Sequence, residues 1–357
     1  MKQICLRCNR TVNDGHLWCQ EKNCPGGKNP VILEGGEWFG DLEILRFVVA
    51  LETAAIYEVR RNNDILLLKI AYEGFEEKLK REAQTLLELI KFQHPALPVL
   101  LPAYLREETA RHPYGKTVFR DRTLYFFVFE MVHGDTLRNF LLKNPQPWYQ
   151  IAGWLLIGLA DGLALLHQAD RFHGCLYPEM VYMRFDREQI PRPLLLDLGA
   201  ACSSAEMRRL WKPSYTLPSY MAPELIPGIN ENYANSTTTD VYGLGLLLFE
   251  MLAGHPTYPS TLTREGELYR MIAHGHHEPL NRPDLEKIPL IIERAIHRDT
   301  QIRPKDVAAL HSELQAFLPP LPKEKKPYPW GWKHAFILLG TLLGLSLLCV
   351  TVLILPG

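Results

Sequence analysis

Residues 335–355 carry no charged side chain, and this run constrains the chain more than any other feature of the sequence. The segment reads AFILLGTLLGLSLLCVTVLIL, and as a helix it would span about 30 Å of hydrocarbon. A buried helix of this length in a soluble protein normally carries a polar face. The run therefore predicts one membrane-spanning helix. Because only Pro356 and Gly357 follow, the span resembles a C-terminal anchor.

Basic and aromatic side chains stand directly before this span. They are Lys323, Lys325, Lys326, Lys333, Trp330 and Trp332. Positive charge next to a span marks its cytoplasmic side, and tryptophan is enriched at the level of the lipid headgroups. We therefore expect a single-pass membrane protein with its N-terminal domains in the cytoplasm.

The rest of the chain divides into four parts of different composition. Residues 1–27 hold four of the seven cysteines, and residues 28–39 form a linker that contains glycine and proline. Residues 40–318 begin strand-rich and become helix-rich after residue 135, which predicts an α+β domain. Residues 319–334 are rich in proline and lysine and predict an extended linker to the membrane. The net charge of −1 gives no indication of nucleic-acid binding.

Cys5, Cys8, Cys19 and Cys24 form two close pairs with ten residues between the pairs. Four thiolates at this spacing can surround one tetrahedral Zn²⁺, and the metal would supply folding energy that so small a segment cannot gain from a core. The pattern is similar to a short zinc ribbon. Four reduced thiols or two disulfides are the alternatives, and a cytoplasmic location disfavours disulfides. Zinc ribbons can bind nucleic acid, but this one lacks a dense basic patch.

Two segments near the start of the central region each carry one notable charge. Lys69 follows three leucines in the strand-like stretch ILLLKIAY, and Glu82 lies in the amphipathic stretch LKREAQTLLEL. Taken alone, each would be interpreted as a solvated surface charge. Five further motifs follow in order: LYFFVFEMV, LLLDLG, TLPSYMAPEL, TTDVYGLGLLLFEM and AIHRDTQIRPKDVAAL. The interpretation depends on the whole series and its spacing.

The series resembles the protein kinase superfamily and is most similar to bacterial Ser/Thr kinases held in the membrane by one helix. The resemblance covers residues 40–318 and implies a bilobal α+β fold. It also implies a site for ATP with Mg²⁺, in which the strand lysine holds phosphates and the helix glutamate orients that lysine. The matching positions are Lys69, Glu82, Glu130, which opens the segment joining the lobes, and Asp197.

Three more matching positions are implied to be structural. Glu224 ends the Ala-Pro-Glu motif, and Asp240 stands in the segment that matches the family's long buried helix. Arg303 lies in the segment that matches the closing helix. The resemblance implies that Arg303 pairs with Glu224 and anchors the segment before the large-lobe core.

The catalytic loop departs from the family pattern. Residues 173–180 read HGCLYPEM where the family reads H-R-D-x-K-P-x-N. Cys175 replaces the aspartate that orients the substrate hydroxyl, Tyr177 replaces the lysine that neutralises the transferred phosphoryl group, and Met180 replaces a magnesium ligand. A thiol, a phenol and a thioether cannot supply these functions, so we expect no catalytic residue at these positions.

The phosphate-binding glycines are also missing. Alignment with the family's Gly-x-Gly-x-x-Gly places Val49, Leu51 and Ala54 at the three glycine positions, and no glycine occurs between residues 41 and 73. Side chains there would hinder the approach of backbone amides to phosphates. Glu52 adds negative charge near the place where phosphates would lie.

Two readings of function follow, with a third that is weaker. The first is a membrane-anchored pseudokinase that acts as a signalling scaffold or nucleotide sensor and binds an unidentified cytoplasmic protein; any ATP with Mg²⁺ would be held weakly. The second is an active Ser/Thr protein kinase that transfers the γ-phosphate with residues other than the family's own. The third is nucleic-acid binding through the zinc ribbon.

Gly340 and Gly344 lie four residues apart in the apolar run and therefore on one helix face. Small residues at this spacing let two membrane helices approach closely, which predicts a homodimer through the span. The alternative is that glycine is simply common in membrane helices.

Overall fold

The computed structural model describes residues 2–7, 10–22, 24, 28–105, 112–228, 236–259 and 265–324. The chain forms two units, Met1–Leu321 and Pro322–Gly357, and almost all described residues belong to the first. Cys8 and the predicted span 335–355, with Gly340 and Gly344, lie outside the described residues.

A seven-stranded antiparallel sheet forms the first lobe, in the order β3-β4-β5-β6-β9-β7 with β8 paired to β9. Its strands are β3 (Trp38–Phe39), β4 (Leu42–Ala50), β5 (Ala54–Arg61), β6 (Asp64–Ala71), β7 (Leu100–Leu101), β8 (Gly115–Phe119) and β9 (Arg122–Glu130). Successive side chains of a strand point to opposite faces. Leu66 and Leu68 of β6 therefore pack in a cluster on one face, while Leu67 packs in the core that the two lobes share. Lys69 lies on the same face as Leu67.

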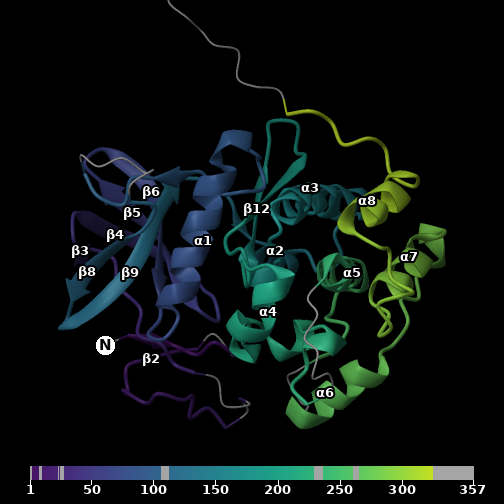
Figure 1. Ribbon diagram of the computed structural model, residues 1–357, viewed down its shortest axis with the longest axis horizontal. Helices are drawn as coiled ribbons and strands as arrows, with labels where there is room; N and C mark the ends of the chain where they lie inside the picture. The colour runs from purple at the N-terminus through teal and green to yellow at the C-terminus, as the bar shows by residue number, and fades with distance from the viewer. Residues whose placement is uncertain are drawn as a thin grey trace, which may run out of the picture. The chain divides into compact units, whose positions relative to one another are not determined.

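Helix α1 (Glu76–Leu89) covers that second face of the sheet and is followed by the 3₁₀ turn η1 (Ile90–Phe92). Its buried positions recur every three or four residues, as expected for an amphipathic helix. Two of them, Lys78 and Glu82, are charged and stand one helical turn apart. Figure 1 shows α1 between the sheet and the helices of the second lobe.

The second lobe is mainly helical. Its helices are α2 (Leu137–Lys143), α3 (Tyr149–Gln168), α4 (Ser204–Leu210), α5 (Thr237–Ala253), α6 (Glu265–His274), α7 (Ile288–Ala295) and α8 (Val307–Gln315). A small sheet joins β10 (Asp135–Thr136), β11 (Val181–Phe185) and β12 (Pro191–Leu195). Single 3₁₀ turns are η2 (Pro178–Met180), η3 (Pro213–Tyr215), η4 (Pro218–Tyr220), η5 (Pro223–Leu225) and η6 (Pro283–Leu285). The predicted two-lobed α+β arrangement is confirmed (Figure 1).

Helix α5 is buried along almost its whole length, from Thr239 to Leu252. A capping box of Ser236 and Thr239 begins it, and Gly254 in a left-handed conformation ends it. Helix α3 packs against α5, α8 and β12. Among the described residues, α3 is the helix long and apolar enough to cross a membrane, but more than half of its apolar window is buried within the protein. A core helix of a soluble domain meets the same criterion, and α3 has that position here.

The N-terminal residues form a small structure on the sheet lobe. β1 (Gln3–Ile4) pairs with β2 (Thr11–Val12), and residues 28–32 of the predicted linker run beside residues 2–6. The amide of Ile4 donates to the carbonyl of Pro30 (3.1 Å), and the amide of Ile32 donates to the carbonyl of Lys2 (2.9 Å). The other end of the predicted linker forms β3 in the main sheet. Residues 28–39 therefore connect the cysteine segment to the lobe by ordered hydrogen bonds.

Candidate functional site

Lys69 and Glu82 meet at the junction of the sheet and α1. Lys69 lies on β6, on the face that α1 covers, and Glu82 lies on the buried face of α1. The Nζ atom of Lys69 is 2.7 Å from both carboxylate oxygens of Glu82. The structure thus brings together the two residues that the family resemblance pairs.

Asp197 reaches the same point from the second lobe, in the turn after β12. Its Oδ2 lies 2.6 Å from Nζ of Lys69, and its Oδ1 accepts from the amide of Gly199 at 2.7 Å. Two hydrogen bonds between side chains and the backbone hold the turn: Nζ of Lys69 donates to the carbonyl of Leu196, and the amide of Leu198 donates to the carboxylate of Glu82. Gly199 has a φ of +64°, in the left-handed region that glycine favours.

Lys78 is the residue that the sequence analysis missed. Its Nζ lies 2.8 Å from each carboxylate oxygen of Asp197 and 3.7 Å from Glu82. We call Lys69, Lys78, Glu82 and Asp197 the four-charge cluster; none of the four is more than 2% exposed. One signal was available in the sequence, because Lys78 stands four residues before Glu82 and so lies on the same, buried face of the helix.

Attraction to opposite charges overcomes the cost of burial for Lys78 and Asp197, whereas burial and the nearby charge of Asp197 raise the pKa of Glu82. Burial disfavours the ammonium of Lys78, yet the charges of Asp197 and Glu82 raise its pKa above the usual value. Burial likewise disfavours the Asp197 carboxylate, but Lys69 and Lys78 hold its pKa below the usual range. Lys78 and Asp197 are therefore both charged, as expected for buried groups that are paired and hydrogen-bonded.

The three altered positions of the catalytic loop are all buried. Cys175 and Met180 pack in the core that joins the two lobes, and burial raises the pKa of the Cys175 thiol well above its usual value. The phenol oxygen of Tyr177 accepts a hydrogen bond from the amide of Glu52 at 3.0 Å. Burial also raises the pKa of Tyr177, so its phenol stays neutral.

The turn between β4 and β5 carries the side chains that stand at the family's glycine positions. Val49, Leu51 and Ala54 are buried, and the turn closes with a bond from the amide of Leu51 to the carbonyl of Ala54 (2.8 Å). Val49 and Leu51 belong to the same apolar core as Tyr177. Side chains of both lobes therefore fill the space beneath this turn.

Glu52 at the tip of this turn contacts the N-terminal cysteine segment. Its carboxylate lies 3.1 Å from the guanidinium of Arg7 and is 9% exposed. Burial raises the pKa of Glu52 to about 7, although the charges of Arg7 and Lys28 act in the opposite direction. The sequence pattern gave no indication of this contact.

Glu130, the fourth position matched to the ATP site, is placed apart from the four-charge cluster. It ends β9 with an exposed side chain, and its amide donates to the carbonyl of Val99 at 3.0 Å.

The positions matched as structural lie in the second lobe. Arg303 forms two bonds with Glu224, of 2.8 and 2.9 Å. Asp240 accepts from the amides of His173 (3.0 Å) and Gly174 (2.6 Å), and its Oδ2 lies 2.8 Å from Nε2 of His167. These carboxylates bind a buried guanidinium and the backbone of the catalytic loop, and both are stabilising roles.

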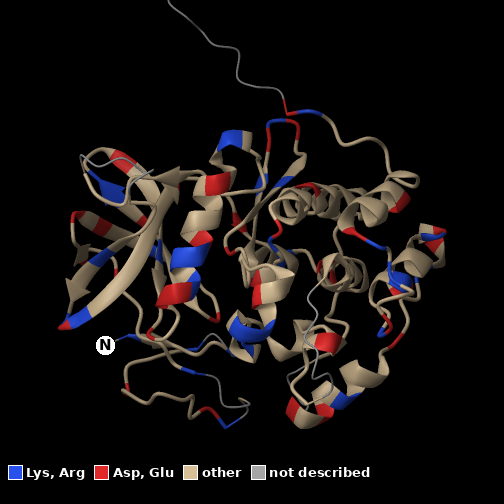
Figure 2. Cartoon of the chain, in the orientation of Figure 1, with Lys and Arg blue, Asp and Glu red and all other residues tan. Residues whose placement is uncertain are grey.

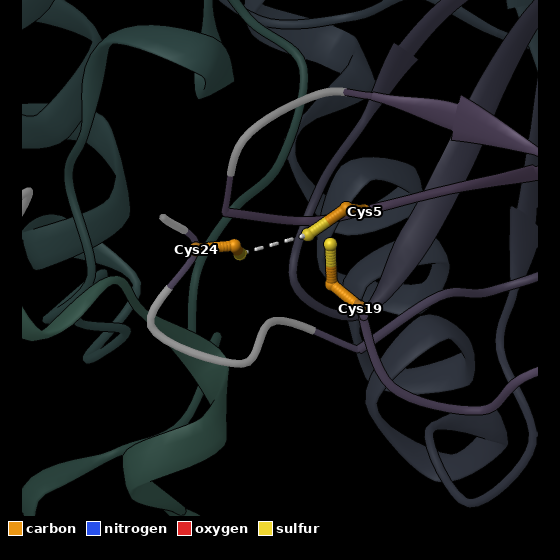
Figure 3. A group of neighbouring side chains, drawn as sticks. All are labelled: Cys5, Cys19 and Cys24. Carbon is orange, nitrogen blue, oxygen red and sulfur yellow. Dashed lines mark hydrogen bonds between the residues drawn. The ribbon is translucent and has the colours of Figure 1, made fainter. Parts of the chain in front are cut away.

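Three of the four predicted zinc ligands converge in the N-terminal segment (Figure 3). The Sγ atoms of Cys5, Cys19 and Cys24 lie within 4.8 Å of one another, with 3.6 Å between Cys5 and Cys24. The amides of Arg7 and Glu21 donate to the sulfurs of Cys5 and Cys19. Sulfur ligands at this separation, with hydrogen bonds from backbone amides that favour thiolates, fit a zinc ion.

Comparison with known proteins identifies similar sequences. The family model described as protein kinase domain matches residues 108–315. Serine/threonine-protein kinase 16 of Homo sapiens is 26% identical over 259 residues, which cover 69% of this chain and 80% of that protein. Serine/threonine-protein kinase pkn2 of Myxococcus xanthus is 28% identical over 275 residues, 70% of this chain and 29% of that protein. Serine/threonine-protein kinase PkaA of Streptomyces coelicolor is 26% identical over 241 residues, 66% of this chain and 40% of that protein. The match thus spans most of the human protein but less than half of each bacterial one.

Proposed function

The chain belongs to the protein kinase domain family, and from this premise we propose that it is a membrane-anchored pseudokinase that acts as a signalling scaffold. The observation that carries the proposal is the burial of three neutral side chains, Cys175, Tyr177 and Met180, at the positions where the family places its catalytic aspartate, lysine and asparagine.

Phosphoryl transfer depends almost entirely on positioning and charge stabilisation. Cys175 has a raised pKa and is a thiol in an apolar core, so it is a poor partner for a substrate hydroxyl. Tyr177 supplies no positive charge, and its oxygen is already bonded to the amide of Glu52. Met180 offers no hard oxygen for a magnesium ion. Each loss removes one of the interactions on which the family's reaction depends.

The second candidate is an active Ser/Thr protein kinase. It is favoured by the retained contact of Lys69 with Glu82 and by the names of the relatives, which are Ser/Thr kinases. The two candidates differ in one measurable property, because only the second requires transfer of a γ-phosphate.

The test is incorporation of radiolabel from γ-labelled ATP by the full chain in lipid nanodiscs, with a general acceptor protein. We expect no incorporation above that of an Asp197→Asn preparation, because a contaminating kinase would label both samples equally. Incorporation by the wild-type chain that disappears in a folded Asp197→Asn variant would establish the second candidate.

We also propose that the cysteine segment binds one zinc ion through Cys5, Cys8, Cys19 and Cys24. The support is the convergence of three sulfurs within 4.8 Å. The contact of Arg7 with Glu52 holds the segment against the sheet lobe, where it would present a surface to a partner. Elemental analysis should find one zinc per chain, lost in Cys19→Ser. Cys202→Ser is the matched control, because Cys202 is buried near α4 and should leave the zinc content unchanged. Protein purified without chelator that holds no zinc would exclude the site.

Anchoring through residues 335–355 and dimerisation through Gly340 and Gly344 complete the proposal, with an unidentified cytoplasmic protein as partner. Figure 2 shows Lys and Arg interspersed with Asp and Glu over both lobes, which disfavours nucleic acid as the partner. Crosslinking of the full chain in membranes tests the dimer. Self-association that persists in the Gly340→Ile, Gly344→Ile double variant would show that the glycines are not the contact face.

A further inference from the structure

We propose that Lys78 is a built-in cation that takes the place of a metal ion at Asp197 and, with Tyr177, closes the site against Mg²⁺ and nucleotide. The inference rests on the proposed pseudokinase function and makes it more specific, because it favours a scaffold without nucleotide over a nucleotide sensor. Protein kinase domains generally use ATP with Mg²⁺. The residues at this site do not fit that pair of ligands, for four reasons.

The first reason is that the Asp197 carboxylate is fully engaged. Oδ1 accepts from Nζ of Lys78 at 2.8 Å and from the amide of Gly199 at 2.7 Å. Oδ2 accepts from Nζ of Lys69 at 2.6 Å and from Nζ of Lys78 at 2.8 Å. A carboxylate offers about four lone-pair positions, and these contacts occupy all four. Mg²⁺ needs a ligand oxygen at about 2.0–2.1 Å in near-octahedral geometry, and neither oxygen has a position left for it.

The second reason is charge. The four-charge cluster contains two ammonium groups and two carboxylates, so the positive charge that Asp197 would otherwise draw from a metal ion is already present. A dication held by Asp197 would lie within a few ångströms of both ammonium groups in a buried environment, where repulsion between like charges is strong. Lys78 and Mg²⁺ are therefore competitors for one carboxylate.

The third reason concerns the donors that hold phosphates. An ammonium has three N–H donors. Those of Lys69 face the Glu82 carboxylate (2.7 Å), Oδ2 of Asp197 (2.6 Å) and the carbonyl of Leu196 (3.0 Å). No donor of Lys69 remains for a phosphate oxygen in this arrangement.

The fourth reason is the turn above the cluster. Phosphate-binding turns present backbone amides to the ligand, but the amide of Glu52 donates to the phenol of Tyr177 instead. Tyr177 is itself fully buried between the lobes, and Glu52 places a carboxyl group where phosphates would need a positive potential. The turn and the loop thus bind one another across the site.

The direct measurement is metal and nucleotide binding by the full chain in nanodiscs. Mn²⁺ serves as the paramagnetic probe for Mg²⁺, read by electron paramagnetic resonance, and a fluorescent ATP analogue reports nucleotide. We expect the wild-type chain to bind neither above the level of an Asp197→Asn variant. The Lys78→Met variant keeps an unbranched side chain, one atom shorter, but removes the charge, and it should bind Mn²⁺ at least about tenfold more tightly than wild type.

Two control variants make the result specific. Lys80 lies on the same helix, pairs with Glu77 and does not contact Asp197. The Lys80→Met variant should therefore bind no Mn²⁺. Adding Asp197→Asn to Lys78→Met should abolish the gained binding, because the carboxylate is the ligand exposed by the substitution.

Binding of Mn²⁺ with nucleotide by the wild-type chain, lost in Asp197→Asn, would overturn the inference, since Lys78 would then leave the site when the ligand arrives. A folded Lys78→Met variant that gains no Mn²⁺ binding would also overturn it. If that variant cannot be purified, the wild-type measurement decides. Nucleotide binding without phosphoryl transfer would leave the pseudokinase proposal standing while this inference fails.

Discussion

Two buried groups of charges in this protein match positions of the kinase family pattern, but they differ in how closely their contacts follow that pattern. In the second lobe, Glu224 binds Arg303 and Asp240 binds the backbone of the catalytic loop. Between the lobes, Lys69, Glu82 and Asp197 are present as well, but Lys78 binds Asp197, and Tyr177 binds the amide of Glu52 in the turn between β4 and β5. The first group holds the architecture; the second holds the two lobes together at the point where the family holds nucleotide.

The difference teaches that a retained residue does not by itself report a retained chemistry. Asp197 is under structural constraint here, because it bonds to two lysines and to the amide of Gly199. Removing any member would leave a buried charge without compensation, which is costly whether or not a ligand is ever bound. These residues therefore contribute to stability independently of any ligand.

The largest effect is expected from a substitution that breaks the pair of Glu224 and Arg303 in the second lobe. Arg303→Ala leaves Glu224 buried without its guanidinium and should destabilise the protein by about 3–5 kcal/mol. The matched control is Arg60→Ala, which removes an exposed partner of Glu43 and should cost only about 0–1 kcal/mol. Urea unfolding followed by circular dichroism measures both. Equal effects would mean that burial does not distinguish the two pairs.

Gly199→Ala tests whether packing fixes the turn that carries Asp197. A Cβ atom at Gly199 would stand 2.2 Å from the carbonyl oxygen of His173, at a φ of +64°. The left-handed conformation costs about 1–2 kcal/mol and the overpacking about 1–3 kcal/mol more. Gly74→Ala, at φ +87° with nothing within 4 Å, carries only the first cost. The melting temperature of Gly199→Ala should therefore fall further than that of Gly74→Ala, because only Gly199→Ala carries the cost of overpacking. Equal melting temperatures would show that the turn can relax.

The pH dependence of stability tests the contact at the tip of the β4–β5 turn. Burial raises the pKa of Glu52 from 4.5 to about 7, so the folded protein keeps a proton that the unfolded chain has released. Stability from this group therefore falls as pH rises from 4.5 through 7, by at most about 3 kcal/mol. Glu52→Gln cannot titrate, so its unfolding free energy minus that of wild type should increase across this range. Parallel curves from urea titrations at several pH values would contradict the raised pKa.

The smallest effect is expected from Tyr177→Phe, which keeps the ring but removes the acceptor of the Glu52 amide. An unsatisfied buried amide costs about 1–3 kcal/mol. Because the Glu52 amide loses its acceptor in this variant, its hydrogen should exchange with solvent faster, as measured by hydrogen-exchange mass spectrometry. Unchanged exchange would mean that the phenol does not hold the turn. Tyr72→Phe is a control, since the Tyr72 hydroxyl makes no bond within the described residues.

Much of the fold and part of the site were predictable from the sequence. The strands around Lys69, the helix that carries Glu82 and the turn with Asp197 are local patterns, readable because strands and helices bury side chains at fixed periods. That Cys175, Tyr177 and Met180 replace the side chains of the family pattern was also readable from the sequence, and the identity of a side chain limits what it can donate, accept or ligate.

Tertiary structure decided how these parts are used. Lys78 meets Asp197 across 119 residues of sequence, and Tyr177 meets the amide of Glu52 across 125. No local period reports such contacts, because the long stem of a lysine can point its charge to solvent or into a core according to what the rest of the fold places beside it. The sequence by itself determined which side chains of the family pattern are replaced in the catalytic loop; only the packing of α1 against the second lobe decided that an ammonium group stands at Asp197.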